Sequence, residues 1–322
     1  MSKADNTEKR ILLRAENVSR VFNIDKKRKL TANDDISINI FKGETLGIAG
    51  ESGCGKTTFT RMLIHLDEPS SGHIFFDGVD ISGLKGEEER QYRRHIQEVF
   101  QDPDGSFNPK MKIRDIVCES LLNYKVIRKE EADKKAGELL KMVGLPEEYK
   151  DRYPFQLSGG QRQRVGIARA LAIDPEIVIC DEATSALDVS VQKNIVELLV
   201  RLQKERDLTI VLICHDIALL RAMSHRIMIM YLGNVVEVVQ SRELGKDIAH
   251  PYTRALIDSI FSLDMDFSKP INVIESEAPS PINVPAGCPF RDRCQMCTEK
   301  CTKEKPVLRE VSQGHEIACH NI

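Results

Sequence analysis

Residues 50–57 of the chain read GESGCGKT, which fits the spacing G-x-x-x-x-G-K-[ST] of a phosphate-binding loop. An apolar run, TLGIA at residues 45–49, precedes this stretch, and apolar residues at helical spacing follow it. Glycines allow successive backbone N–H groups to turn toward phosphate oxygens, and the N-terminus of the following helix adds partial positive charge. The sequence therefore predicts a phosphate-binding loop between a buried strand and a helix.

Two side chains of this loop are suited to nucleotide chemistry. Lys56 places a flexible cation within reach of β- and γ-phosphate oxygens, and the Thr57 hydroxyl is a ligand that Mg²⁺ accepts. Cys54 occupies a variable position of the motif, and we interpret it as a spacing residue without a redox role. The expected nucleotide contacts are Gly50, Glu51, Ser52, Gly53, Cys54, Gly55, Lys56, Thr57 and Thr58.

A second apolar run, IVIC at residues 177–180, ends in two adjacent carboxylates, Asp181 and Glu182. Ligands of open α/β sheets bind at the carboxyl ends of the strands, which is where these side chains would lie. Asp181 can hold Mg²⁺ through water, and Glu182 can orient or deprotonate an attacking water. A solvated strand end is the alternative interpretation for either carboxylate, and the nearby glycine loop makes it the weaker one.

A Ser-Gly-Gly run at residues 158–160 forms a second donor-rich turn before a predicted helix at residues 162–172. This turn has the same physical capacity to cradle a phosphate as the first loop. Since one γ-phosphate needs only one such cradle, we expect the second to contact a nucleotide held by another subunit. The chain is therefore predicted to pair with a sister subunit.

The composition excludes several classes of protein. The 322 residues include 46 Lys and Arg and 49 Asp and Glu, so the net charge is −3. A general nucleic-acid binder usually has a clear excess of positive charge, which this chain does not have. The uninterrupted apolar runs are far shorter than the roughly 20 residues that a membrane-spanning helix needs. The first residues lack the apolar core of a signal peptide, so we expect a chain that stays in the cytosol.

Strand and helix patterns alternate along the chain. Period-two alternation at residues 36–40 predicts a half-buried strand, and the apolar runs at 177–180 and 209–214 predict buried ones. Residues 128–143 and 191–205 have helical periodicity. This alternation is typical of an α/β fold with a largely parallel sheet covered on both faces.

The composition changes near residue 245, and five prolines follow between residues 270 and 289. We therefore divide the chain into a flexible tail at residues 1–10, a core domain at residues 11–245 and an extension at residues 246–322. The extension carries most of the cysteines.

Taken together, the motifs resemble those of the ATP-binding cassette family, in the family's order and over most of the chain. The matching residues are Gly50–Thr57, Gln101, Leu157–Gln161, Asp181, Glu182, Asp188 and His215. The resemblance implies a P-loop NTPase-type nucleotide-binding domain with a largely parallel sheet, an antiparallel β subdomain and an α-helical subdomain at about residues 105–160. It also implies that ATP and Mg²⁺ are the cofactors.

The resemblance assigns roles to individual residues. Gln101 would contact Mg²⁺ and the attacking water and couple to a membrane subunit, and His215 would contact the γ-phosphate. The implied catalytic residues are Glu182, His215 and Gln101, and the implied Mg²⁺ ligands are Thr57, Gln101 and Asp181. The implied contacts to the sister subunit's ATP are Ser158, Gly159, Gly160, Gln161 and Asp188.

Phe22 looks like the aromatic residue that stacks on adenine in this family. Its spacing from the glycine loop depends on a basic insertion at residues 26–29. Taken alone, Phe22 would be interpreted as a core residue of a strand.

The sequence HPYT at residues 250–253 and the sequence AGCPFRDRC at residues 286–294 resemble the oligopeptide/dipeptide importer branch. The glycine loop with Cys54 and the segment Asn108-Pro109 resemble the F-type ATPases of that branch more than the D-type. That branch implies an ATPase, peripheral on the cytoplasmic face of the inner membrane, that drives peptide uptake. The implied partners are a D-type ATPase, two integral-membrane permeases and an external substrate-binding protein, without nucleic acid. Importers of nickel, glutathione or glycosides use similar ATPases, and a soluble cassette ATPase of DNA repair or translation is the alternative from another class.

Four cysteines of the extension, Cys288, Cys294, Cys301 and Cys319, match positions at which relatives with this tail are thought to hold a [4Fe–4S] cluster. Cys297 adds a fifth thiol and complicates the choice of the third ligand. Irregularly spaced thiols in a cytosolic protein also suit zinc or simply reduced structural cysteines.

Overall fold

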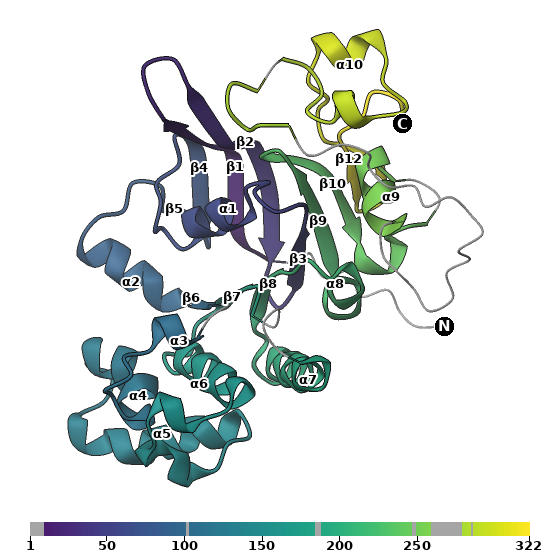
Figure 1. Ribbon diagram of the computed structural model, residues 1–322. Helices are drawn as coiled ribbons and strands as arrows, with labels where there is room; N and C mark the ends of the chain where they lie inside the picture. Colours follow the sequence, from purple (N-terminus) through teal and green to yellow (C-terminus); the bar gives the residue numbers. More distant parts are fainter. Residues whose placement is uncertain (1–9, 101–102, 184–187, 247–248, 259–278, 285) are drawn as a thin grey trace.

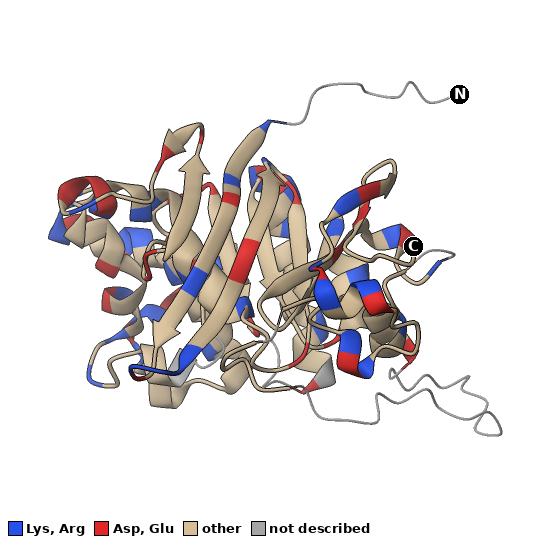
Figure 2. Cartoon of the chain, turned by 90° about the horizontal axis from the view of Figure 1, so that it is seen from above, with Lys and Arg blue, Asp and Glu red and all other residues tan. Residues whose placement is uncertain are grey.

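The computed structural model describes residues 10–100, 103–183, 188–246, 249–258, 279–284 and 286–322. Two β-sheets occupy the centre of Figure 1, with a helical lobe at one end and the C-terminal part of the chain at the other. Lys and Arg are interspersed with Asp and Glu over these parts in Figure 2, as the near-balanced charge count implies.

The smaller sheet is antiparallel, in the order β2-β1-β4-β5. Its strands are β1 (Ile11–Asn23), β2 (Lys29–Phe41), β4 (Ser71–Phe76) and β5 (Val79–Asp80). Ile36, Ile38 and Ile40 alternate with exposed or half-buried neighbours, which confirms the strand predicted from their period of two. The strand β2 begins earlier than predicted because it pairs with β1 along its whole length.

The larger sheet has the order β11-β12-β10-β9-β3-β8-β7-β6. Five neighbouring strands, from β6 to β9, are parallel, which confirms the predicted sheet, and the other three continue it antiparallel. The bounds are β3 (Thr45–Ala49), β6 (Ile96–Val99), β7 (Ile177–Asp181), β8 (Thr209–Ile213), β9 (Arg226–Tyr231), β10 (Asn234–Gln240), β11 (Arg309–Ser312) and β12 (His315–Ile317).

The strands β11 and β12 were not predicted from the sequence. They come from the last part of the extension, and β12 pairs with β10 of the core domain. The sheet therefore crosses residue 245, where the change of composition places the domain boundary.

The described helices are α1 (Lys56–Leu63), α2 (Glu87–His95), α3 (Pro103–Ser106), α4 (Ile113–Asn123), α5 (Ala132–Met142), α6 (Gly159–Leu171), α7 (Val189–Arg206), α8 (Ile217–Met223), α9 (Pro251–Asp258) and α10 (Glu299–Lys303). None of them combines the length and the apolar character needed to cross a membrane. The helix predicted at residues 128–143 starts as a 3₁₀ turn, η1 (Lys129–Glu131), and continues as α5. It ends before Gly144, whose φ of 73° suits the left-handed residue after a helix.

The strand β7 separates two hydrophobic cores. Ile177 and Ile179 belong to the core between α1 and the two sheets, whereas Val178 and Cys180 belong to the core under α6, α7 and the helical lobe. Burial of such a side chain contributes roughly 1.5–3 kcal/mol, so both faces of the strand are strongly specified. Burial on both faces explains why the sequence of this strand is a continuous apolar run.

Candidate functional site

The glycine loop lies between β3 and α1, and its backbone passes very close to two other segments. An added Cβ at Gly50 would lie 2.3 Å from the carbonyl oxygen of Met230, and one at Gly55 would lie 2.1 Å from that of Ala32. Both glycines also have positive φ angles, 153° and 104°. Only glycine fits these positions without strain.

Lys56 is buried at the base of this loop, with 5% of its surface exposed. Its Nζ donates hydrogen bonds to the carbonyl oxygens of Gly50, at 2.8 Å, and Glu51, at 3.0 Å. Cys54 is also buried, and burial raises the pKa of its thiol. A neutral, buried thiol agrees with the interpretation of Cys54 as a spacing residue, and Lys56 supplies the cation of the loop.

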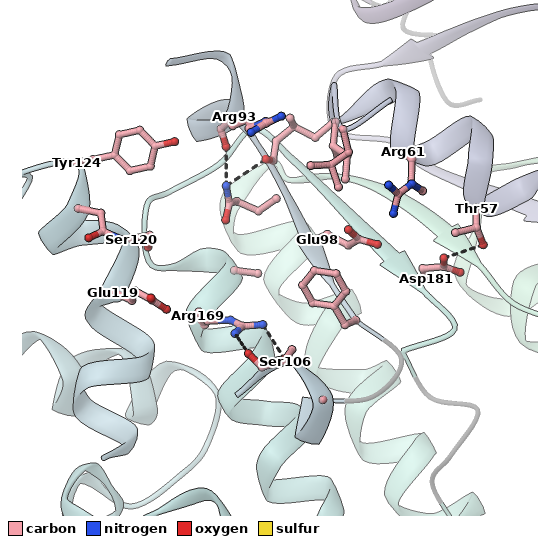
Figure 3. A pocket seen from close by; sticks show the side chains of 18 residues that line it. Thr57, Arg61, Arg93, Glu98, Ser106, Glu119, Ser120, Tyr124, Arg169 and Asp181 are labelled. Carbon is pink, nitrogen blue, oxygen red and sulfur yellow. Dashed lines mark hydrogen bonds between the residues drawn. The ribbon is translucent and has the colours of Figure 1, made fainter. Parts of the chain in front are cut away.

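Thr57 and Asp181 lie together although they are far apart in the sequence. The Thr57 hydroxyl donates to Oδ2 of Asp181 at 3.0 Å, which joins the start of α1 to the end of β7 (Figure 3). Burial raises the pKa of the Asp181 carboxyl. A hydroxyl and a carboxylate are hard oxygen donors, so these two residues fit Mg²⁺. Gln101, the third expected ligand, lies outside the described residues.

Glu182 and His215 also lie together, at the ends of neighbouring strands. His215 Nε2 is 2.5 Å from Oε1 of Glu182, and the Glu182 N–H donates to the carbonyl oxygen of Ile213 at 3.0 Å. The backbone of Glu182 is left-handed, with a φ of 49°. Such strain costs of order 1–3 kcal/mol and collects at functional sites. The parallel pairing of β7 with β8 brings the two expected catalytic residues to one edge.

The Ser-Gly-Gly turn begins α6 in the helical lobe, apart from α1 in Figure 1. Ser158 caps the helix by accepting the Gln161 N–H at 3.4 Å, and Gln161 returns the contact by accepting the Ser158 N–H at 2.9 Å. Asp188 is exposed at the start of α7. The second cradle is thus formed on a different element from the first, and its contact to another subunit's nucleotide stays a prediction.

Phe22 lies on β1 with 38% of its surface exposed, which excludes the alternative interpretation as a buried core residue. The guanidinium of Arg20 lies 4.6 Å from the ring centroid and covers one face of the ring. Stacking on adenine stays a prediction.

A cavity of about 870 Å³ extends from Thr57 and Asp181 toward the helical lobe (Figure 3). Glu98 lines it, and burial together with the charge of Asp181 raises the pKa of Glu98 to about 7. Sequence analysis missed this residue. The available signal was a charged residue within a short strand, β6, whose first and last residues are buried and apolar.

The cysteines of the extension pack near one another. The Cys288 N–H donates to the carbonyl oxygen of Cys301 at 2.7 Å, and both residues are buried, whereas Cys297 is exposed. However, the described part of the chain, which includes all five of these cysteines, holds no group of three or more His, Cys, Asp or Glu placed to bind a metal ion. The expected [4Fe–4S] cluster is therefore not supported.

Comparisons with known proteins agree with this geometry. A family model described as ABC transporter matches residues 33–185, and one described as the oligopeptide/dipeptide transporter C-terminal region matches residues 236–301. The oligopeptide transport ATP-binding protein OppF of Escherichia coli K12 is 45% identical over 296 residues, which cover 91% of this chain and 88% of that protein. The OppF of Haemophilus influenzae is 43% identical over 297 residues, covering 91% and 90%.

The chain belongs to the ATP-binding cassette family of transporter ATPases. Within that family it carries the C-terminal region of the oligopeptide/dipeptide branch. Among solved structures, the dimeric post-hydrolysis cassette MJ0796 with bound ADP and Pi superposes with a TM-score of 0.65 and 34% identity, over 72% of this chain and 99% of that one. This ABC ATPase therefore has the cassette fold that the motifs imply.

Proposed function

We propose that this ABC ATPase hydrolyses ATP to drive the uptake of oligopeptides or dipeptides through membrane permease subunits. The observation that carries the proposal is the Thr57–Asp181 contact at 3.0 Å, because it joins the phosphate loop to the strand end that bears Glu182. The relatives named as oligopeptide transport proteins and the matching C-terminal region support peptide as the cargo over nickel, glutathione or glycosides.

The residues of the site divide the work of hydrolysis among them. The loop N–H groups and Lys56 bind the β- and γ-phosphates. Thr57 and Asp181 would hold Mg²⁺, which when bound would supply positive charge against these phosphate oxygens. Glu182 orients a water and accepts its proton as the water attacks the γ-phosphorus. The bond to the β-phosphate breaks, and ADP and inorganic phosphate leave. His215 contacts Glu182 and would donate to the γ-phosphate.

The second cradle supports a role for this chain in a dimer. The Ser158 turn and Asp188 would contact ATP bound by a D-type sister ATPase, and the sister's turn would contact the ATP bound here. ATP shifts the open–closed equilibrium of such a pair because its γ-phosphate is contacted across the closed interface only. Gln101 would pass this change to the permeases. The ATPase would sit peripherally on the cytoplasmic face of the membrane, and an external binding protein would deliver the cargo.

Glu182→Gln tests the assignment of the base. It should lower steady-state hydrolysis at least a hundredfold and leave ATP binding intact, since the amide cannot accept the proton. Bound ATP should then hold the chain in a dimer with its sister, detected by size-exclusion chromatography. Lys56→Ala should instead lose ATP binding.

Glu176→Gln is the matched control, because Glu176 precedes the opposite end of β7 and pairs there with His95. Its hydrolysis rate should stay normal. If Glu182→Gln hydrolyses ATP within a few-fold of the unmodified protein, Glu182 is not the base.

The [4Fe–4S] cluster rests on the resemblance alone, and the proposed function includes no step through it. Iron and labile sulfide are to be measured on protein purified anaerobically. About four iron atoms per chain would establish a cluster of the [4Fe–4S] type. Iron-free, folded protein would assign the cysteines as reduced structural thiols or zinc ligands.

A further inference from the structure

Glu51, the second residue of the phosphate loop, is held by two residues of the C-terminal extension. Its backbone N–H donates to the hydroxyl of Tyr252, in α9, at 2.9 Å. Both of its carboxylate oxygens accept from Nη1 of Arg293, each at 3.0 Å. Arg293 lies in the 3₁₀ turn η5 (Arg291–Arg293), next to Cys294. These contacts join the loop to residues more than 200 positions later in the chain.

The two residues of the extension are firmly supported. Tyr252 is fully buried, and its ring centroid lies 4.7 Å from that of Tyr231 and 5.4 Å from that of Phe290. The side chain of Arg293 is only 6% exposed, and its Nη1 also donates to the Tyr231 hydroxyl at 3.3 Å. Rigid aromatic packing of this kind fixes the position of the two groups that hold Glu51.

The negative charge of Glu51 makes its contacts with Arg293 important for nucleotide binding. A carboxylate in a loop that binds a polyphosphate repels its ligand, and the repulsion is strong where the site is partly shielded from water. Burial acts to lower the pKa of Arg293, but hydrogen bonds to Glu51 and Tyr231 outweigh it and the pKa is raised. Arg293 is therefore charged, and it neutralises Glu51 within hydrogen-bonding distance.

We propose that Arg293 and Tyr252 are positioning residues of the ATP site, which neutralise and orient Glu51 so that the phosphate loop binds ATP tightly. The extension is then part of the nucleotide site of its own chain. This inference rests on the ATP-binding part of the proposed function. Neither residue touches the nucleotide in this role, and both act through Glu51.

A comparison of single and double variants of the full-length chain tests the proposal. The dissociation constant of Mg²⁺-AMPPNP is the readout. Arg293→Met should weaken binding about tenfold, the size expected from losing one charge-assisted pair. Glu51→Gln/Arg293→Met should recover most of that loss, because the unpaired carboxylate is gone. Arg293→Lys, which keeps the charge, should bind within about threefold of the unmodified chain.

Recovery in the double variant separates positioning from a merely structural role. If Arg293 only anchored the extension, the double variant would bind as weakly as Arg293→Met, and the proposal would be overturned. Equal binding by Arg293→Met and the unmodified chain would overturn it too, while leaving the proposed function intact. Failure of the unmodified chain to bind Mg²⁺-AMPPNP would instead contradict the proposed function.

Two further variants keep the test decisive. Arg291→Met is the matched control, since Arg291 lies in the same turn but donates to the carbonyl oxygen of Ala286 and pairs with Asp292. It should leave the dissociation constant unchanged. If Arg293→Met does not fold, Tyr252→Phe replaces it. Removing the hydroxyl that accepts the Glu51 N–H should weaken binding a few-fold, and unchanged binding would overturn the proposal.

Discussion

His250 shows, at the scale of one residue, how a motif of the extension acts as a structural element. It is 1% exposed, and its Nδ1 accepts the backbone N–H of Tyr252 at 3.1 Å, so the imidazole caps the start of α9. The neighbouring titratable groups are Glu237, whose carboxylate accepts the backbone N–H of His250, and His315, which contacts the other oxygen of Glu237. Burial lowers the pKa of His250 to about 4.

This lowered pKa predicts a pH dependence of stability. His250 takes up a proton near pH 6.5 in the unfolded chain but only near pH 4 in the folded chain. The stability that neutral His250 contributes is therefore fully present above pH 6.5 and is lost as the pH falls toward 4. Between pH 7 and pH 5 the free energy of unfolding should fall by about 2 kcal/mol from this group. His250→Asn should remove this loss, because Asn caps a helix without titrating. Denaturant unfolding at both pH values measures the difference, and an equal loss in the variant would contradict the assignment.

At the scale of one element, two of the three glycines of α6, Gly160 and Gly166, lie in opposite environments. An added Cβ at Gly160 would lie 2.4 Å from Cγ1 of Val191 in α7, whereas one at Gly166 would meet only Cζ of Phe107, at 3.9 Å. The first glycine permits the close approach of two helices, and the second occupies ordinary packing space. The Ser-Gly-Gly sequence thus has a packing requirement beside its expected contact to phosphate.

Alanine at these two positions should change stability in opposite directions. Gly166→Ala should raise the free energy of unfolding by about 0.5–1 kcal/mol through the better helix propensity of alanine. Gly160→Ala should lower it by roughly 1–3 kcal/mol, because α7 must move to admit the methyl group. Urea unfolding compares the two variants with the unmodified chain. A higher free energy of unfolding for Gly160→Ala would show that α7 can move away from the added methyl group at no cost.

At the scale of the whole molecule, one buried carboxylate fastens the extension to the core domain. Glu237 of β10 is 1% exposed, and it accepts from the His250 N–H at 2.8 Å and lies 2.7 Å from Nε2 of His315 in β12. It thereby connects the antiparallel part of the large sheet to two separate segments of the extension, the start of α9 and the strand β12.

Glu237→Ala should therefore lower the free energy of unfolding by about 3 kcal/mol or more, since it leaves buried partners unsatisfied. Backbone amides of β12 should also exchange with solvent faster, which hydrogen–deuterium exchange would detect. Glu316→Ala is the control, because Glu316 lies in β12 and is half-buried. We expect it to change the free energy of unfolding by no more than about 0.5 kcal/mol. Unchanged exchange in β12 after Glu237→Ala would show that strand pairing alone holds the extension.

Much of the fold could be predicted from local sequence because each pattern reflects a local physical requirement. The glycine loop predicted its flanking strand and helix, and the two-sided burial of β7 appears directly as an apolar run. Element ends were less predictable. The helix expected to start at residue 162 starts at Gly159, because Ser158 and Gln161 form a reciprocal cap. The strand β11 is mostly exposed, and β12 is only three residues long, so neither shows a clear strand pattern in the sequence. They exist through pairing of β12 with β10 and of β11 with β12.

The chemical groups of this ATPase could be predicted before its fold was known, because a phosphate loop, a strand-end carboxylate pair and a helix cap each depend on residues a few positions apart. Which of these groups meet depends on how the strands and helices pack. The Thr57–Asp181 contact depends on strand order, and the contacts of Glu51 with Tyr252 and Arg293 join segments whose separation along the chain carries no periodic signal. Such long-range pairs are set by packing of the whole chain, which short-range patterns do not encode.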